Sequence, residues 1–200
     1  MTLPKTLLQM AGADQTPNAF GDSVVVAIDQ QNEYLSGALP LTGVEEALAE
    51  AATVLARARA VGAPVIHVVH KGSPGGAFDL DAERGKIANA VAPVSSEVIV
   101  EKTLPNSFAG TTLGNELDKT GRKKLIVTGF MTHMCVSATV RAALDLGFST
   151  TLVSRATATR DLPSALGGQV VRADAVAEAT LAALADRFAI IVASAADLTD

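Results

Sequence analysis

Three residues far apart in the sequence combine a carboxylate, an amine and a thiol: Asp29, Lys102 and Cys135. Each lies at or just beyond the end of an apolar run rich in β-branched residues, which is typical of a buried strand. A thiolate is a strong nucleophile, a carboxylate can take up and return its proton, and an ammonium stabilises negative charge. This combination predicts acyl transfer through a thioester, followed by hydrolysis.

The position of Cys135 suggests how its thiol is activated. A helix beginning near His133 and capped by Thr132 would place Cys135 in its first turn, where backbone N–H groups and the helix dipole favour an anion. The ammonium of Lys102 would lower the pKa of the thiol further. Asp29 would take the thiol proton and later return it to a leaving amine, while N–H groups of the same turn hold an oxyanion.

Each of the three residues also has an ordinary structural interpretation. A single cysteine is most often a small residue of the core. An aspartate at a strand end is often a cap or turn residue, and a lysine there is usually solvated. The prediction of a site therefore depends on three complementary groups meeting at one edge of a sheet.

The elements that must position these groups alternate between strand and helix along the chain. Apolar runs predict six strands, at residues 23–29, 64–70, 97–101, 123–129, 149–154 and 188–192. Helices are predicted at residues 43–61, 81–91, 133–147 and 172–187. This alternation predicts an α/β protein with a three-layer α/β/α fold and a six-stranded, mainly parallel sheet. We expect a single domain at residues 21–200 after an N-terminal arm at residues 1–20.

Composition excludes several classes of protein. The chain has 200 residues and a formal net charge of −5 at pH 7, which argues against a nucleic-acid surface. A single cysteine excludes an intrachain disulfide and a multi-cysteine zinc site. The sequence contains no long uncharged apolar run of the kind that predicts a membrane span. No secretory signal is recognised either, so we expect a cytoplasmic protein. The first strand is followed by no glycine-rich nucleotide motif.

Three sequence motifs resemble those of the isochorismatase-like cysteine hydrolases, a superfamily that includes nicotinamidases, N-carbamoylsarcosine amidohydrolases and ureidoacrylate amidohydrolases. Residues 25–34 (VVAIDQQNEY) are similar to a hydrophobic run followed by Asp-x-Gln-Asn-acidic-aromatic. Residues 102–111 (KTLPNSFAGT) resemble Lys-x(4)-Ser-Phe-x-Gly-Thr, and residues 129–136 (GFMTHMCV) resemble Gly-x-x-Thr-x-x-Cys-Val. The motifs occur in the order of the family, and the resemblance covers residues 22–192.

The resemblance implies a role for each of these groups. Cys135 would be the nucleophile, Asp29 the general base and acid, and Lys102 the charge that supports the thiolate. A cis peptide bond between Phe130 and Met131 would aim the N–H groups of Met131 and Cys135 at one oxyanion. No cofactor is expected, the substrate would be a small molecule, and the resemblance implies a homo-oligomer, expected to be a dimer or a tetramer.

Two departures from the family narrow the expected activity. Nicotinamidases carry a metal site with an Asp-x-His-x-x-His pattern after the second strand, whereas here a Gly/Pro loop without further ligands follows His67 and His70. The two histidines are three residues apart on a strand and point to opposite faces, so we expect no metal ion. We interpret His67 as a core or cross-sheet residue. Isochorismatases of this superfamily commonly lack the cysteine, so Cys135 counts against their vinyl-ether cleavage.

A substrate pocket is expected around the same motifs. The candidate lining residues are Gln31, Tyr34, His70, Phe108 and His133. Core packing for Phe108, a surface loop for Tyr34 and a helix start for His133 are the structural alternatives. An aromatic, mostly uncharged pocket suits a small amide or carbamoyl compound. No arginine lies within the motifs, but Arg155 and Arg160 follow the fifth strand and are candidates to bind a carboxylate.

Three hypotheses of function follow. The leading one is a cofactor-free cysteine hydrolase that cleaves a C–N bond through a thioester. The second is an isochorismatase-type ether or ester hydrolase, whose turnover would resist thiol alkylation. The third is a non-catalytic α/β protein that binds a small ligand or serves as an assembly subunit.

Overall fold

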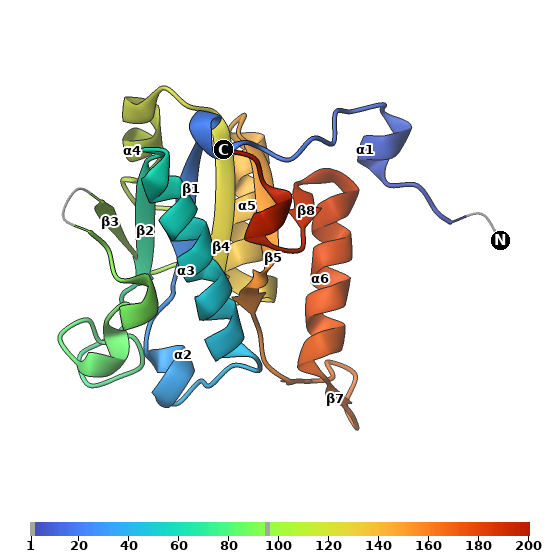
Figure 1. Cartoon of the computed structure of the whole chain (residues 1–200). Coiled ribbons are helices and arrows are strands. Elements are labelled where there is room, and N and C mark those ends of the chain that lie inside the picture. Colours follow the sequence, from blue (N-terminus) through green and yellow to red (C-terminus); the bar gives the residue numbers. More distant parts are fainter. Residues whose placement is uncertain (1–2, 95–96) are drawn as a thin grey trace.

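Six parallel strands form a single sheet at the centre of the molecule (Figure 1). A computed structural model describes residues 3–94 and 97–200. The strand order is β3-β2-β1-β4-β5-β8. The strands are β1 (Ser23–Ile28), β2 (Val65–His70), β3 (Val98–Lys102), β4 (Lys124–Phe130), β5 (Ser149–Ala158) and β8 (Ile190–Val192). The three-layer α/β/α fold and the six-stranded parallel sheet predicted from the sequence are confirmed.

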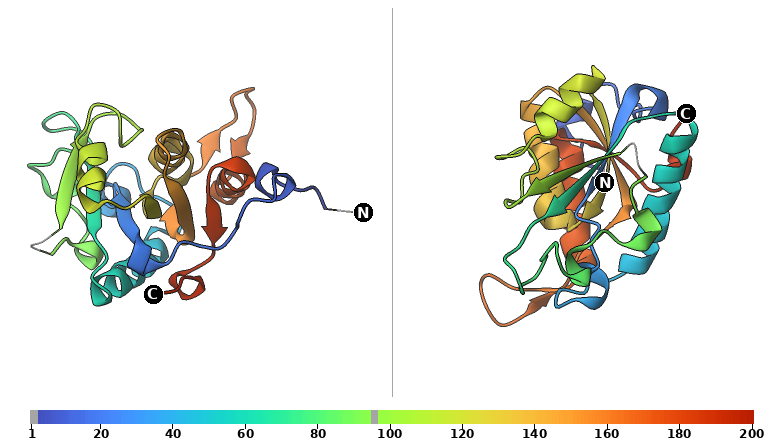
Figure 2. Two further views of the ribbon diagram at one scale, coloured as in Figure 1. Left: turned by 90° about the horizontal axis from the view of Figure 1, so that it is seen from above. Right: turned by 90° about the vertical axis from the view of Figure 1, so that its left-hand side faces the viewer.

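The helices cover both faces of this sheet, as the edge-on view of Figure 2 shows. The described helices are α1 (Leu7–Met10), α2 (Glu33–Ser36), α3 (Val44–Ala60), α4 (Leu113–Thr120), α5 (Ser137–Asp145) and α6 (Ala173–Arg187), of which α1 lies against α6 rather than on the sheet. Alternate residues of β1 enter separate cores: Val25 and Ala27 pack with α3, whereas Val24 and Val26 pack with α4, α5 and α6. Every residue of β1 is buried, as expected for a central parallel strand.

Sequence periodicity located α3, α5 and α6 but not the shorter elements. It missed α4, as well as the small antiparallel hairpin of β6 (Leu162–Pro163) and β7 (Val170–Val171). It also ended the fifth strand at residue 154, whereas β5 continues to Ala158. Beyond a register shift, Gly129 and Phe130 pair with Thr157 and Ala158. This extension brings the residues after β5 to the edge of the sheet where β1 and β4 end.

The helix predicted at residues 81–91 is not formed. Two 3₁₀ turns, Glu83–Gly85 and Asn89–Val91, occupy the segment instead, and Ile87 pairs with Gln31 in an isolated bridge. A Cβ atom on Gly85 would lie 2.0 Å from the carbonyl oxygen of Asp79, so the loop folds back closely at this glycine. The segment therefore lies beside the residues that follow β1 instead of forming a helix.

The N-terminal segment, residues 3–19, contains α1, which lies against α6, and then returns to the sheet before β1 (Figure 1). The Leu7 N–H donates to Asp186 Oδ1 at 2.8 Å. Asn18 ties the segment to the sheet, because its side-chain amide donates to the carbonyl oxygens of Leu125 and Ser149. Within the described residues, no helix has the length and apolar character needed to span a membrane.

Candidate active site

The three groups singled out in the sequence lie together at the carboxyl edge of the sheet. Asp29 follows β1, Lys102 is the last residue of β3, and Cys135 follows β4. The relative exposures of these residues are 0%, 2% and 5%. The order of strands places β1 between β2 and β4, so side chains from three strands converge on one buried position.

The Lys102 ammonium is at the centre of this cluster. Its Nζ atom lies 2.7 Å from Asp29 Oδ2, 3.2 Å from Cys135 Sγ and 3.2 Å from His70 Nδ1. A buried ammonium is costly unless its charge is compensated and its hydrogens find acceptors. Here a carboxylate provides the compensating charge, and the sulfur and the imidazole nitrogen provide two more acceptors.

The backbone of Asp29 turns sharply as the chain leaves β1. Its φ of 50° is in the left-handed region, which aspartate tolerates better than most residues. The Asp29 N–H still continues the sheet by donating to the carbonyl oxygen of Val68 at 2.8 Å, and the Asp29 carbonyl accepts from Gln31 N–H. The turn thus leaves the carboxylate at the end of the central strand, facing Lys102.

The chain before Cys135 approaches β1 very closely. A Cβ atom on Gly129 would lie 2.0 Å from the carbonyl oxygen of Ile28, and Gly129 has a φ of 126°, so this position requires glycine. The peptide bond between Phe130 and Met131 is cis. No described carbonyl group accepts the Met131 N–H, which is therefore free to bind another acceptor.

The turn that carries Cys135 differs from the one predicted. Residues Thr132–Val136 form a π-helical turn that leads into α5, with Val136 N–H donating to the Met131 carbonyl. The side chain of Thr132 makes no capping hydrogen bond, and among the described residues its buried hydroxyl has no partner. The predicted cap by Thr132 is wrong.

The thiol of Cys135 is not activated in the resting site. Burial raises its pKa to about 12, reinforced by the negative charge of Asp29 and opposed by the ammonium of Lys102. Lys102 thus acts in the predicted direction, but burial outweighs it, so the pKa of the thiol is raised rather than lowered. Burial also raises the pKa of Asp29, against the opposing effect of Lys102. A pKa of about 12 keeps the Cys135 thiol neutral at pH 7, and the charge of Lys102 offsets part of the effect of burial on Asp29.

Asp29, His70 and Cys135 offer an oxygen, a nitrogen and a sulfur within 4.8 Å of one another, a donor set that also suits a metal ion such as zinc. However, Lys102 Nζ contacts all three groups. The cation of this cluster is thus the ammonium, and a metal ion at the same position would have to displace it.

Aromatic rings close one side of the cluster. Tyr34 is buried and makes edge-to-face contacts with Phe78 and Phe130, at centroid distances of 5.1 and 5.8 Å. Phe78 also contacts the ring of His70. Burial, together with the charges of Asp29 and Cys135, raises the pKa of Tyr34, so its hydroxyl stays protonated. Sequence reasoning missed Phe78, which follows the Gly/Pro loop and has a positive φ of 59°.

His133 and Arg160 lie on the side of the cluster where β5 ends. His133 Nδ1 is 2.6 Å from Thr159 Oγ1. Burial lowers the pKa of His133, and the charge of Arg160 lowers it further. Arg160 is half-buried, and its Nε has no hydrogen-bond partner among the described residues. Arg155 is instead exposed, so only Arg160 of the two predicted arginines lies near the site.

Two residues predicted to line the pocket have other roles in the structure. Gln31 is fully buried, and its amide bonds the N–H and carbonyl of His70 and the carbonyl of Gly85. Phe108 stacks on Phe148, which precedes β5 at the opposite end of the strands. Core packing, the structural alternative for Phe108, is therefore the role that the structure gives it.

The second motif fixes the chain after Lys102. Ser107 is buried, its N–H donates to Thr139 Oγ1 at 3.0 Å, and the Thr139 hydroxyl donates to Ser107 Oγ. Because Thr139 belongs to α5, these bonds connect the segment after β3 to the helix that follows Cys135. The segment that follows Lys102 is thus hydrogen-bonded to the helix that follows Cys135.

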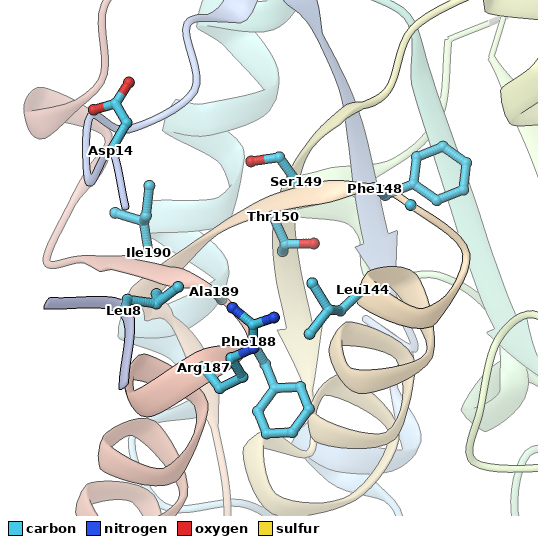
Figure 3. A pocket seen from close by; sticks show the side chains of 11 residues that line it. Leu8, Asp14, Leu144, Phe148, Ser149, Thr150, Arg187, Phe188, Ala189 and Ile190 are labelled. Carbon is cyan, nitrogen blue, oxygen red and sulfur yellow. The ribbon is translucent and has the colours of Figure 1, made fainter. Parts of the chain in front are cut away.

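The cavity in Figure 3 lies at the other end of the sheet from this cluster. Its volume is about 300 Å³, and it is lined by residues of α1, the start of β5 and the end of α6, including Leu8, Thr150 and Arg187. None of its lining residues belongs to the cluster around Lys102.

Comparison with known proteins agrees with this geometry. The model of the isochorismatase domain matches residues 23–196, so the chain belongs to the isochorismatase family of hydrolases. A crystal structure of an isochorismatase from Pseudomonas putida KT2440 is 41% identical, with a TM-score of 0.93 over 98% of this chain and 100% of that one.

Curated relatives carry different names. The secreted isochorismatase effector Isc1 of Verticillium dahliae is 35% identical, over 92% of this chain and 95% of its own length. A maleamate amidohydrolase of Pseudomonas putida is 28% identical, over 76% of this chain and 84% of its own length. The family thus includes proteins named for different reactions, and the side chains of the site must decide between them.

Proposed function

We propose that the protein is a cysteine amidohydrolase that cleaves a C–N bond of a small amide or carbamoyl compound through a thioester. The observation that carries this proposal is the contact of one ammonium, Lys102 Nζ, with both Cys135 Sγ at 3.2 Å and Asp29 Oδ2 at 2.7 Å. A nucleophile, its base and a fixed positive charge are the parts that covalent acyl transfer needs.

In the first half of the reaction, Asp29 takes the thiol proton as Cys135 Sγ attacks the carbonyl carbon. The N–H groups of Met131 and Cys135 bind the oxyanion. Asp29 then gives its proton to the nitrogen as the C–N bond breaks and the amine leaves. In the second half, water attacks the thioester, loses a proton to Asp29 and releases the acid, and the sulfur recovers that proton. Lys102 remains an ammonium throughout.

The resting protonation states suit this order of events. Because burial raises the pKa of Cys135 to about 12, the enzyme does not hold a standing thiolate. The nucleophile forms only when Asp29 accepts the proton, and Asp29 then holds the proton that the leaving amine requires. The raised pKa of Asp29 makes it a better base than an exposed aspartate.

The groups around the cluster support a small substrate with a carboxylate. Arg160 is half-buried, and a guanidinium pairs well with a planar carboxylate. The relative named maleamate amidohydrolase also favours an amide substrate. We infer that the amide carbonyl lies at Cys135 while the carboxylate points to Arg160.

The second candidate is an ether hydrolase, favoured by the names of the Pseudomonas putida structure and of Isc1. That reaction needs no thioester. The two candidates are separated by assaying a panel of amides, carbamoyl compounds and ureas with the wild type, Cys135→Ser and Cys135→Ala. We expect amide hydrolysis by the wild type, a loss of about 10⁴-fold or more in both variants, and an acyl adduct on Cys135 in acid-quenched samples. Full turnover by Cys135→Ala would exclude the amidohydrolase proposal.

A further inference from the structure

We propose that His70 is a positioning residue, a neutral imidazole whose Nδ1 accepts from Lys102 and holds the ammonium between Asp29 and Cys135. The catalytic consequence rests on the proposed cysteine chemistry, whereas the protonation state and the contact can be tested without any substrate.

The contact follows from the register of the sheet. His70 and Lys102 end the neighbouring strands β2 and β3, where they are directly paired. Their side chains meet at 3.2 Å, from Nζ to Nδ1. The carboxyl edge of the sheet therefore brings a fourth side chain to the cluster, beyond the three that the motifs identified.

The number of hydrogens on the ammonium assigns the role. A protonated lysine has three N–H donors and no acceptor. Lys102 has three neighbours within 3.2 Å: Asp29, Cys135 and His70. Asp29 is held as an ion pair, and because an ammonium can only donate, its contact with His70 requires a lone pair on Nδ1. The imidazole proton is then on Nε2, because a neutral imidazole carries only one.

The surroundings of His70 favour the same protonation state. Burial, and then the charge of Lys102, lowers its pKa to about 4. The groups that face it are the Lys102 ammonium from β3, the Asp29 carboxylate after β1, the Cys135 thiol after β4 and the ring of Phe78. At neutral pH the imidazole is therefore an acceptor for Lys102 rather than a competing cation.

The imidazole is itself held in place. The Gln31 amide binds both the N–H and the carbonyl of His70, at 2.9 and 3.0 Å, and Phe78 contacts the ring edge-to-face at a centroid distance of 5.1 Å. A fixed backbone and a packed ring keep Nδ1 on the ammonium. Nε2 has no described hydrogen-bond partner and is not among the fully buried unpaired atoms, so it reaches accessible space.

The direct test is nitrogen NMR of protein labelled with ¹⁵N in histidine. The chain has only three histidines, so the His70→Asn variant assigns the signal of His70. We expect a neutral imidazole with its proton on Nε2 at pH 7. Lys102→Met removes the donor and the charge, and His70 should then titrate at a higher pH than in the wild type. An imidazolium at pH 7, or a proton on Nδ1, would overturn the proposal.

Substitutions separate the acceptor from simple packing. His70→Asn keeps an acceptor close to the position of Nδ1 but is small, whereas His70→Leu keeps apolar bulk against Phe78 and has no acceptor. The readout is the rate at which iodoacetamide alkylates Cys135 in the folded protein, with urea-unfolded samples as the control. We expect His70→Leu to be slower than the wild type by roughly 10-fold, the effect of one charged hydrogen bond, and His70→Asn by less than about threefold.

A rate for His70→Leu equal to or above that of His70→Asn would mean that packing matters and the acceptor does not. These outcomes do not depend on the proposed function, which fails separately if Cys135→Ala keeps its amide hydrolysis. A neutral Nε2–H imidazole in a protein that hydrolyses no amide would leave His70 as a positioning residue and remove only its catalytic consequence.

Discussion

The Asp29 carboxylate and the Lys102 ammonium are 2.7 Å apart, and both side chains are fully buried. Each would be an uncompensated charge without the other, because water cannot solvate either. Their mutual dependence gives the site a thermodynamic signature that can be measured without a substrate.

Replacing one partner should therefore cost more than replacing both. We expect Lys102→Met or Asp29→Asn alone to lower the free energy of unfolding by about 3 kcal/mol, and the double variant to recover most of that loss. Urea unfolding of the three variants measures this coupling. If the loss in the double variant equals the sum of the single losses, the pair is not coupled.

The pH dependence of the reaction should reflect the raised pKa of Asp29. Below this pKa the carboxyl carries a proton and cannot accept another from Cys135, so kcat/KM should fall as the pH decreases. Because burial raises the pKa, the midpoint of this acid limb should lie above 3.8, the ordinary value for aspartate. A pH–rate profile at constant ionic strength tests it, and a midpoint at or below 3.8 would contradict the assignment.

A second buried charge cluster should control stability in acid. Glu97 accepts hydrogen bonds from Arg59, His67 and the Val94 N–H. Burial alone would raise the pKa of Glu97, but these bonds outweigh it and hold it at about 2; burial lowers the pKa of His67. In acid the unfolded chain thus binds more protons than the native protein, so stability falls as the pH drops.

Unfolding at a series of pH values tests this cluster. We expect a decrease that begins below pH 6.5 through His67 and continues from 4.5 to about 2 through Glu97. Glu97→Gln should be less stable at pH 7 by about 3 kcal/mol, and its stability should change less between pH 4.5 and 2. An equally steep decline in this variant would assign the acid sensitivity to other groups.

Gln31 should stabilise the fold although it lies in the first of the three sequence motifs. Gln31→Leu leaves the N–H and carbonyl of His70 and the carbonyl of Gly85 without their partner, which should cost roughly 1–3 kcal/mol. Gln169→Leu, at an exposed position, is the control and should change stability by less than about 0.5 kcal/mol. Equal urea midpoints for the two variants would refute the role of Gln31.

Arg160 should affect binding more than chemistry. For an amide substrate with a carboxylate, Arg160→Gln should raise KM by roughly 10-fold or more with little change in kcat, because a charged hydrogen bond is lost. A neutral amide should be hydrolysed equally by the variant and the wild type. Arg155→Gln, at an exposed position, is the matched control, and identical effects of the two substitutions would exclude carboxylate binding by Arg160.

Strand positions and reactive residues could be predicted from sequence because both follow local rules. β-branched runs located all six strands of the sheet, and the carboxyl-edge rule then placed Asp29, Lys102 and Cys135 together. The resemblance added their expected roles. The helix predicted at residues 81–91 does not form because the path of this segment depends on the close approach at Gly85, which periodicity cannot detect.

The electrostatics of the site could not be predicted in the same way. Neighbouring charges suggested a lowered pKa for Cys135, but burial has the larger effect and acts in the opposite direction. Phe108 and Gln31 belong to motifs, yet one packs in the core and the other holds a strand end. Phe78 belongs to none of the motifs, but its ring lies against His70. Burial and side-chain direction are tertiary properties, so spacing alone does not contain them.

The raised pKa of Cys135 also has a consequence for the lifetime of the enzyme. Peroxides and electrophilic metabolites react with thiolates far faster than with neutral thiols. The sole cysteine of this chain is 5% exposed, and burial raises the pKa of its thiol to about 12. The site is therefore protected between turnovers, and oxidative inactivation should be slow in the resting enzyme.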